Sequence, residues 1–238
     1  MKAAQKKSKN DGHVLALNKN IKGVRALLDI ASRPKIRAVE KRILLRSAIV
    51  LFVACWEAFV EDLARTAFKF MQKEAGDCSK VPDSIKRRLS EQLLKIKDPI
   101  YPWSLAEDGW KNVLQKHGDT AIQEWVDAVN TPSSQAVSQL FEKLIGLRNM
   151  PNFWSWRGMS ANQAKARLAE YIRIRGEIAH RVSANTRVAK TVISRTFVID
   201  HVNFIFRLAT RSCNGVRKHL VKSFGKEPWP SYSYRATK

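Results

Sequence analysis

Residues 45–57, Leu-Arg-Ser-Ala-Ile-Val-Leu-Phe-Val-Ala-Cys-Trp-Glu, contain the longest apolar run of the chain, which extends from Ala48 to Trp56. Apolar residues at intervals of three or four positions begin and continue the same pattern on both sides of this run: Ile36, Val39, Ile43, Phe59, Leu63 and Ala67. This period predicts one long α-helix that ends near Gly76. Because the middle of the helix is apolar on all sides, we expect it to lie at the centre of a bundle. The run itself is too short to span a bilayer.

The segments beyond the central helix also have helical periods. The stretch from Val14 to Leu28 carries an apolar stripe that predicts a first helix. Ser160 and Gln163 form a capping box that opens a later helix, and the last helix is expected from about residue 188 to residue 224. No segment shows the alternation that is typical of a β-strand, so we expect a single all-α bundle.

The region between the first two and the last two of these helices differs, because its periodic segments are short. Ser104 and Glu107 form a capping box for one small helix, which we expect to end at His117-Gly118. The predicted fold is therefore a helical bundle with a long central helix and an inserted small-helix region. We divide the chain into three parts: a basic disordered arm over 1–12, a single helical domain over 13–225 and an irregular C-terminal tail over 226–238.

Charge is distributed unevenly along the chain. The net charge is +22, and it comes from the two ends, since residues 1–46 contribute +10, residues 165–238 contribute +12 and the middle is neutral. Charge that served solubility alone would not divide in this way, so the pattern predicts two basic ends that bind a polyanion. Two alternatives are a solvated face without a partner and binding to an anionic membrane surface.

Several classes of chemistry lack their sequence signatures. Cys55, Cys78 and Cys213 are widely spaced and form no metal-ligand pattern, which predicts a reducing cytoplasm and no zinc. The chain has no glycine loop for a triphosphate, no dinucleotide fingerprint and no H-E-x-x-H motif. Its basic N-terminus lacks the apolar core of a signal peptide. We therefore expect a cytoplasmic protein that uses no metal or other cofactor and does not bind a membrane.

Arg175 and His180 lie near the end of the helix that Ser160 opens. An arginine binds a phosphate through two parallel hydrogen bonds and a histidine transfers protons near neutral pH, so the pair suits phosphodiester chemistry without a metal. Positions five apart on a helix differ by about 140° in azimuth, so we expect two chains to combine their motifs across a two-fold axis. In the alternative interpretation, Arg175 pairs with a buried carboxylate, Glu57 or Glu61, and His180 caps the helix end.

Three stretches together resemble the HEPN superfamily, and specifically its bacterial RiboL-PSP-HEPN branch: Trp154-Ser-Trp-Arg-Gly-Met-Ser160, Ile-Arg-Gly-Glu-Ile-Ala-His180 and the central run over 45–57. The resemblance covers roughly residues 36 to 220. It implies an all-α bundle that dimerises, sets two R-x4-6-H motifs in a shared cleft and cleaves RNA without a metal, with Arg175 and His180 as the catalytic pair. Ribonucleases of this branch often resemble toxins or anti-phage effectors. Many active members have Asn, Asp or His directly after the arginine, where this chain has Gly176.

Other residues are candidates for supporting roles. Glu57 on the central helix and Glu177 within the motif are candidate supports for the catalytic pair. Basic side chains near the motif and on the last helix are candidate RNA contacts: Arg173, Arg181, Arg217, Lys218 and Lys222. Trp154 and Trp156 either stack on bases or pack on the bundle. No role follows for the histidines without a partner at motif spacing: His13, His117, His201 and His219.

The function that these features predict is a metal-independent endoribonuclease for single-stranded RNA, in a host-defence or toxin context. The alternative is a non-catalytic module with a degenerate motif, which uses its basic ends to hold RNA or an acidic partner protein. The expected partners are RNA, a second copy of the chain, and an acidic protein or antitoxin.

Overall fold

The computed structural model describes residues 12–180 and 193–233, and within that part of the chain it is built from α-helices and short 3-10 turns, without a β-strand. The α-helices of the described residues are α1 (Gly12–Ala31), α2 (Ala38–Glu74), α3 (Asp83–Leu93), α4 (Gly109–Asp127), α5 (Ser134–Ile145), α6 (Ala161–His180) and α7 (Arg195–Phe224). The predicted all-α class, with a long central helix and a region of small helices inserted after it, is confirmed.

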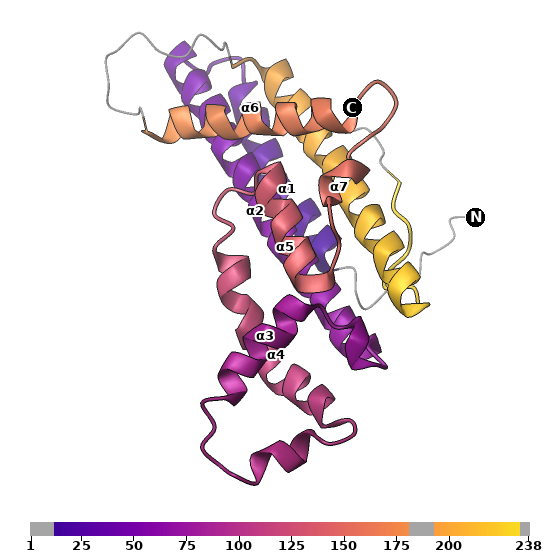
Figure 1. Ribbon diagram of the computed structural model, residues 1–238. Helices are drawn as coiled ribbons and strands as arrows, with labels where there is room; N and C mark the ends of the chain where they lie inside the picture. The colour runs from indigo at the N-terminus through magenta and orange to yellow at the C-terminus, as the bar shows by residue number, and fades with distance from the viewer. Residues whose placement is uncertain (1–11, 181–192, 234–238) are drawn as a thin grey trace, which may run out of the picture.

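Helix α2 is the element around which the others are arranged (Figure 1). It is 37 residues long and packs against α1, α4, α5, α6 and α7. The large side chains in its middle, Phe52, Trp56 and Phe59, are buried, as the apolar run predicted. By length and composition alone α2 is apolar enough to cross a membrane, but half of its most apolar window is buried inside the fold, as in the core helix of a bundle.

Trp154 connects α7 to the central helix α2. Its side chain is fully buried, its indole N–H donates to the Ser212 hydroxyl of α7 at 2.9 Å, and its ring meets the edge of Trp56 with the ring centres 5.9 Å apart. The Trp56 indole in turn donates to the Pro132 carbonyl oxygen at 3.0 Å, just before α5. Trp156 packs against Phe204 of α7. Of the two interpretations of these tryptophans, packing on the bundle is therefore confirmed.

The start of α6 and the end of α7 agree with prediction, whereas the start of α7 does not. That helix was expected from about residue 188, but it begins at Arg195, because the Ser194 hydroxyl accepts from the Phe197 backbone N–H and caps it there. The Gln163 backbone N–H donates to the Ser160 hydroxyl at 3.2 Å, and the Ser160 N–H donates to the Gln163 side-chain oxygen at 2.8 Å, which is the reciprocal pattern of a capping box. Gly225 ends α7 in the left-handed conformation, with φ of 71°. The central helix ends with Ala75 as its C-cap, one residue before Gly76.

Predictions of helix ends within the inserted region were wrong. Ser104 lies in a 3-10 turn and donates its hydroxyl to the Tyr101 carbonyl oxygen, and α4 begins only at Gly109. The helix also does not end at Gly118. A Cβ at this position would lie 3.1 Å from the Phe68 ring of α2, so the glycine permits close packing of α4 on α2 and is retained inside the helix for that reason.

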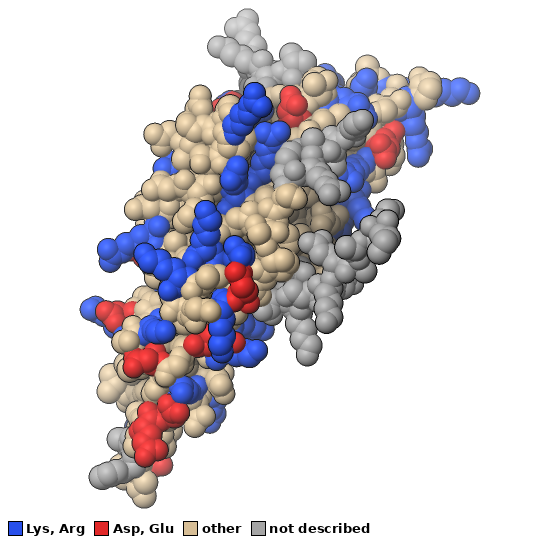
Figure 2. Space-filling model, turned by 90° about the vertical axis from the view of Figure 1, so that its right-hand side faces the viewer, with Lys and Arg blue, Asp and Glu red and all other residues tan. Residues whose placement is uncertain are grey.

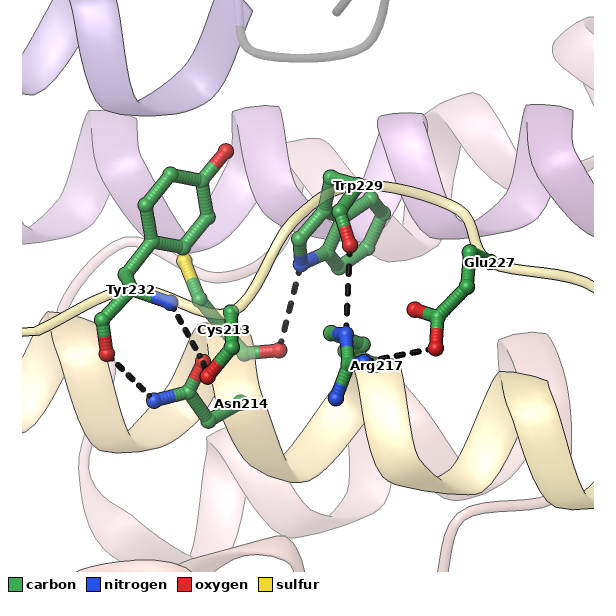
Figure 3. Close-up of polar contacts among 7 residues, drawn as sticks. Cys213, Asn214, Arg217, Glu227, Trp229 and Tyr232 are labelled. Carbon is green, nitrogen blue, oxygen red and sulfur yellow. Dashed lines mark hydrogen bonds and ion pairs between the residues drawn. The ribbon is translucent and has the colours of Figure 1, made fainter. Parts of the chain in front are cut away.

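The segment after α7 is held against the bundle by specific contacts, and we name residues 226–233 the C-terminal strap (Figure 3). Trp229 is buried and its ring lies 5.0 Å from that of His13 on α1. The Asn214 side chain accepts from the Tyr232 backbone N–H at 3.0 Å and donates to the Tyr232 carbonyl oxygen at 2.8 Å. The strap thereby joins the two ends of the described chain across α7.

The buried indole hydrogen bond gives a stability prediction. Ser212→Ala removes the acceptor of the Trp154 N–H and leaves a buried donor unpaired, so we expect the free energy of unfolding to fall by about 1–3 kcal/mol. Urea denaturation measures the change. Ser47→Ala makes the same substitution at an exposed position of α2 and is expected to be neutral or slightly stabilising. Equal effects of the two substitutions would contradict the role given to this hydrogen bond.

Candidate active site around Arg175

Helix α6 presents one apolar stripe to the bundle and places Arg175 beside it. The buried residues of the stripe recur at helical spacing: Ala164, Leu168, Tyr171, Ile174 and Ile178. Arg175 follows Ile174 directly, and it is half-buried where α6 packs across α2. Arginine is rarely placed at such a boundary for solubility alone, because its charge loses part of its hydration there.

Glu57 of α2 is close enough to Arg175 for the two charges to interact. Burial raises the pKa of Glu57 above its ordinary value, and the positive charge of Arg175 opposes this shift only in part. Glu57 and Arg175 nevertheless form no ion pair within 4 Å, and within the described residues the Arg175 guanidinium makes no hydrogen bond. The alternative interpretation, in which Arg175 is a paired structural arginine, requires a contact that this part of the chain does not contain.

A second carboxylate lies one helical turn beyond Glu57. Burial raises the pKa of Glu61, and the negative charge of Glu57 raises it further. Arg65, the next residue along this face, is engaged elsewhere, because it binds Gln123 at 2.8 Å and Asp127 at 3.0 Å. Glu57 and Glu61 therefore form a partly desolvated acidic pair on α2, and Glu57 is the member that interacts with the charge of Arg175.

Two of the predicted supporting residues bind each other. The Arg173 guanidinium contacts Glu170 at 2.7 Å and also contacts Glu177, both on α6. Arg173 is exposed, but its charge is balanced by these two carboxylates. Two arginines that lie two positions apart in the sequence therefore differ in the structure. Arg173 forms ion pairs on the outer surface of α6, whereas Arg175 lies beside the bundle without an ion pair to a described residue.

His180 is the last residue of α6, and its side chain lies outside the described residues, as does the whole of Arg181. The helix continues without interruption from Arg175 to His180. The two residues therefore keep the azimuthal separation of about 140° that an α-helix gives to positions five apart. The two positions therefore lie on different sides of one α6.

The predicted RNA contacts on α7 divide into two kinds. Arg217 belongs to the strap, because it donates to the Trp229 carbonyl oxygen at 3.2 Å and pairs with Glu227 at 2.6 Å (Figure 3). Lys218 and Lys222 are exposed and form no ion pair with any described residue. No pattern in the sequence links Arg217 to Glu227, since the turn at Gly225 brings them together.

Sequence reasoning gave no role to His201, which the structure places in the layer that supports the motif. The side chain is fully buried on α7, stacks on Tyr171 with ring centres 3.3 Å apart, and its Nδ1 lies 2.6 Å from the Phe197 carbonyl oxygen. Burial lowers the pKa of His201 to about 4, so the ring is neutral near pH 7 and packs as an aromatic side chain. The apolar stripe of α7, on which His201 lies beside Val202, was the signal for this role.

Comparison with protein families agrees with this geometry. The family model RiboL-PSP-HEPN matches residues 15–214, which include α2 and the whole of α6. The chain belongs to the RiboL-PSP-HEPN family. No curated protein and no solved structure matches the chain. The family match confirms the resemblance drawn from the sequence, and it ends within α7, before the C-terminal strap.

The acidic pair gives a prediction about stability and pH. Because the pKa of Glu61 is raised in the fold, the folded state holds its proton more tightly than the unfolded state, and ionisation at neutral pH destabilises the fold. We expect Glu61→Gln to be more stable than wild type at pH 7. The difference should shrink as the pH falls through the raised pKa and should close below the ordinary value of 4.5, where the wild-type side chain becomes protonated in both states.

Thermal unfolding between pH 7 and pH 4 measures this difference. Asp119→Asn removes one negative charge from an exposed position of α4 and controls for the net charge of the chain. A stability gain of Glu61→Gln that stayed constant over the pH range, or that Asp119→Asn reproduced, would contradict the assignment.

Proposed function

We propose that this chain is a metal-independent endoribonuclease that cleaves single-stranded RNA through Arg175 and His180. The observation that carries the proposal is the half-buried Arg175 guanidinium, which lies in the motif helix of a RiboL-PSP-HEPN protein and has no ion pair or hydrogen bond within the described residues. A guanidinium in this condition can bind a phosphate through both arms of its fork. The chain's net charge of +22 favours an anionic polymer as substrate.

The chemistry of the proposed reaction needs one proton acceptor and one anion binder. His180 removes the proton from a ribose 2′-hydroxyl, the 2′-oxygen attacks the adjacent phosphorus, and the 5′-oxygen leaves with a proton that a histidine returns. Arg175 binds the phosphate and stabilises the charge that builds on its oxygens. Glu57 holds the orientation of the guanidinium from a distance, which leaves its N–H donors available to the substrate. The products are a 2′,3′-cyclic phosphate and a free 5′-hydroxyl.

We propose that a two-fold dimer completes the site, because one α6 does not bring its Arg175 and His180 to the same face. The surface of α2 supports this arrangement. Val39 and Ile43 are 55% and 56% exposed, and helical geometry places them on the same side of α2 as Glu57. Exposed apolar side chains on one helix face are typical of an interface, although these two lie roughly four to five turns of α2 away from Glu57. A second copy that covers this stripe and continues along the same side of α2 would reach the motif of the first.

The biological setting that we propose is host defence or a toxin–antitoxin pair in the cytoplasm, by analogy with the family. One observation favours the alternative of a non-catalytic module that holds RNA or an acidic partner such as an antitoxin. Gly176 stands where many active members have a polar residue, although a side chain at this position would meet nothing within 4 Å. The cleavage experiment decides between the two functions.

We expect purified protein to cleave single-stranded RNA in excess EDTA and to leave DNA intact. Arg175→Ala and His180→Ala should each lower the rate by about 10²-fold or more, because each removes one element of the acid–base and electrostatic catalysis. Arg173→Ala is the matched control, since Arg173 is paired with Glu170 and Glu177 on the same helix. Gel analysis and end-group mapping of the RNA fragments measure rate and product.

Loss of cleavage on chelation would exclude the proposed mechanism. Equal losses in Arg173→Ala and Arg175→Ala would show a general effect of charge on α6. Unchanged cleavage in both motif variants would assign any activity to a contaminant and favour the non-catalytic module.

The dimer is tested by mass in solution. We expect multi-angle light scattering to give twice the chain mass of 27.1 kDa at micromolar concentration. Val39→Asp with Ile43→Asp should convert the protein to monomer and abolish cleavage, while the far-ultraviolet circular dichroism stays helical, because both side chains are exposed on α2. A monomeric wild type that cleaves RNA would contradict the shared site.

A further inference from the structure

The two basic ends of the sequence meet along one groove between α1 and α7. A cavity of about 220 Å³ lies in this groove, and its walls come from both helices and from the end of the C-terminal strap. Residues of α1 from Val14 to Arg25 line one side, and residues of α7 from Phe206 to Cys213 line the other. Helices from the two basic segments, which are far apart in the sequence, therefore line the same groove.

The basic side chains at this groove are not neutralised by the described part of the chain. Arg25 lines the cavity and Lys22 lies three residues before it on α1; both are exposed, and neither forms an ion pair or hydrogen bond with a described residue. Each helix carries a single acidic residue, Asp29 in α1 and Asp200 in α7. On the face drawn in Figure 2, Asp and Glu gather toward the lower end of the molecule, and Lys and Arg prevail over the rest. The groove therefore attracts anions.

The cavity itself has an apolar floor and a polar rim. Leu17, Phe59 and Ala209 form part of the floor, and Asn18, Thr210 and Tyr232 bring an amide and two hydroxyl groups to the walls. The position of Tyr232 is fixed, because Asn214 binds both its N–H and its carbonyl oxygen (Figure 3). The volume is below the range that drug-sized ligands need, so the cavity suits a single ring system with polar edges.

This groove lies on a different side of α2 from the candidate active site. Phe59 contributes to the cavity, whereas Glu57 faces Arg175. Positions two apart on an α-helix differ by about 200° in azimuth, so the two sites are separated by the thickness of α2. A ligand in the groove does not occupy the motif.

We propose that the α1–α7 groove is a second RNA-binding site, in which Lys22 and Arg25 contact the phosphates of single-stranded RNA and the cavity receives one unstacked base against Tyr232. Single-stranded RNA presents both features that the groove matches, a chain of phosphates and bases that leave the stack onto aromatic side chains. The site holds the strand away from the position of cleavage. The inference rests on the proposed function only in taking RNA as the ligand.

Fluorescence anisotropy with a short labelled oligoadenylate tests the site, and His180→Ala is present in every protein to prevent cleavage. Lys22→Ala with Arg25→Ala should weaken binding and lower the log-log salt slope by roughly 1.4, since each phosphate contact on a single strand contributes ~0.7. Lys95→Ala with Lys97→Ala removes the same charge from the exposed segment after α3 and should change neither value.

The cavity is tested separately by Asn18→Trp, which fills it from an exposed position of α1. This substitution should weaken binding of the oligoadenylate roughly five-fold or more, because stacking of a base is lost. It should leave binding of an abasic strand of the same length unchanged. Ultraviolet crosslinking of RNA that contains 4-thiouridine should attach to the peptide that carries Tyr232.

The site would be overturned if the Lys22→Ala/Arg25→Ala and Lys95→Ala/Lys97→Ala variants lowered RNA affinity equally. It would also be overturned if Asn18→Trp weakened the binding of abasic RNA as much as that of the oligoadenylate. Binding of poly-glutamate but not RNA would also overturn it and would assign the groove to an acidic protein. Failure of cleavage does not bear on this result, because binding is measured in the His180→Ala background.

Discussion

The need to bury the large aromatic side chains of α2 is the constraint on which the rest of the structure depends. Phe52, Trp56 and Phe59 lie in the middle of this helix and would be costly to expose to water, so five other helices pack against it. The polar groups of this interior are paired where the packing requires it. The Trp56 and Trp154 indoles both find oxygen acceptors, and these hydrogen bonds fix how α5 and α7 meet the central helix.

The same constraint separates the functional surfaces. At the end of the apolar run of α2, Glu57 and Glu61 are partly desolvated, and Glu57 interacts with the charge of Arg175 on α6. On another side, Phe59 closes the floor of the groove between α1 and α7. One helix therefore forms the back wall of both sites. A change in its middle would disturb the motif and the groove together, whereas surface changes on α1 or α6 act on one site.

The elements that sequence predicted are those whose signals are local. The stripe of α2, the Ser160–Gln163 capping box and the Gly225 end of α7 all depend on side chains within a few positions of one another. The ends of α4 depend on tertiary contact. Gly118 lies inside this helix because it packs against Phe68 of α2, and the residues next to it in the sequence do not predict that contact. The proximity of Arg175 to Glu57 followed from the apolar period. The binding of Arg217 to the strap could not be predicted from the sequence, because it depends on the turn at Gly225 and on the burial of Trp229.

The packing of His13 against Trp229 joins residues from opposite ends of the chain. During synthesis on the ribosome, α1 emerges before the strap, so this contact forms only after the intervening helices have been translated. Until then, the end of α1 that carries His13 lacks one of its aromatic neighbours. The packing of α1 is therefore completed later than contacts among the helices that lie between α1 and the strap in the sequence.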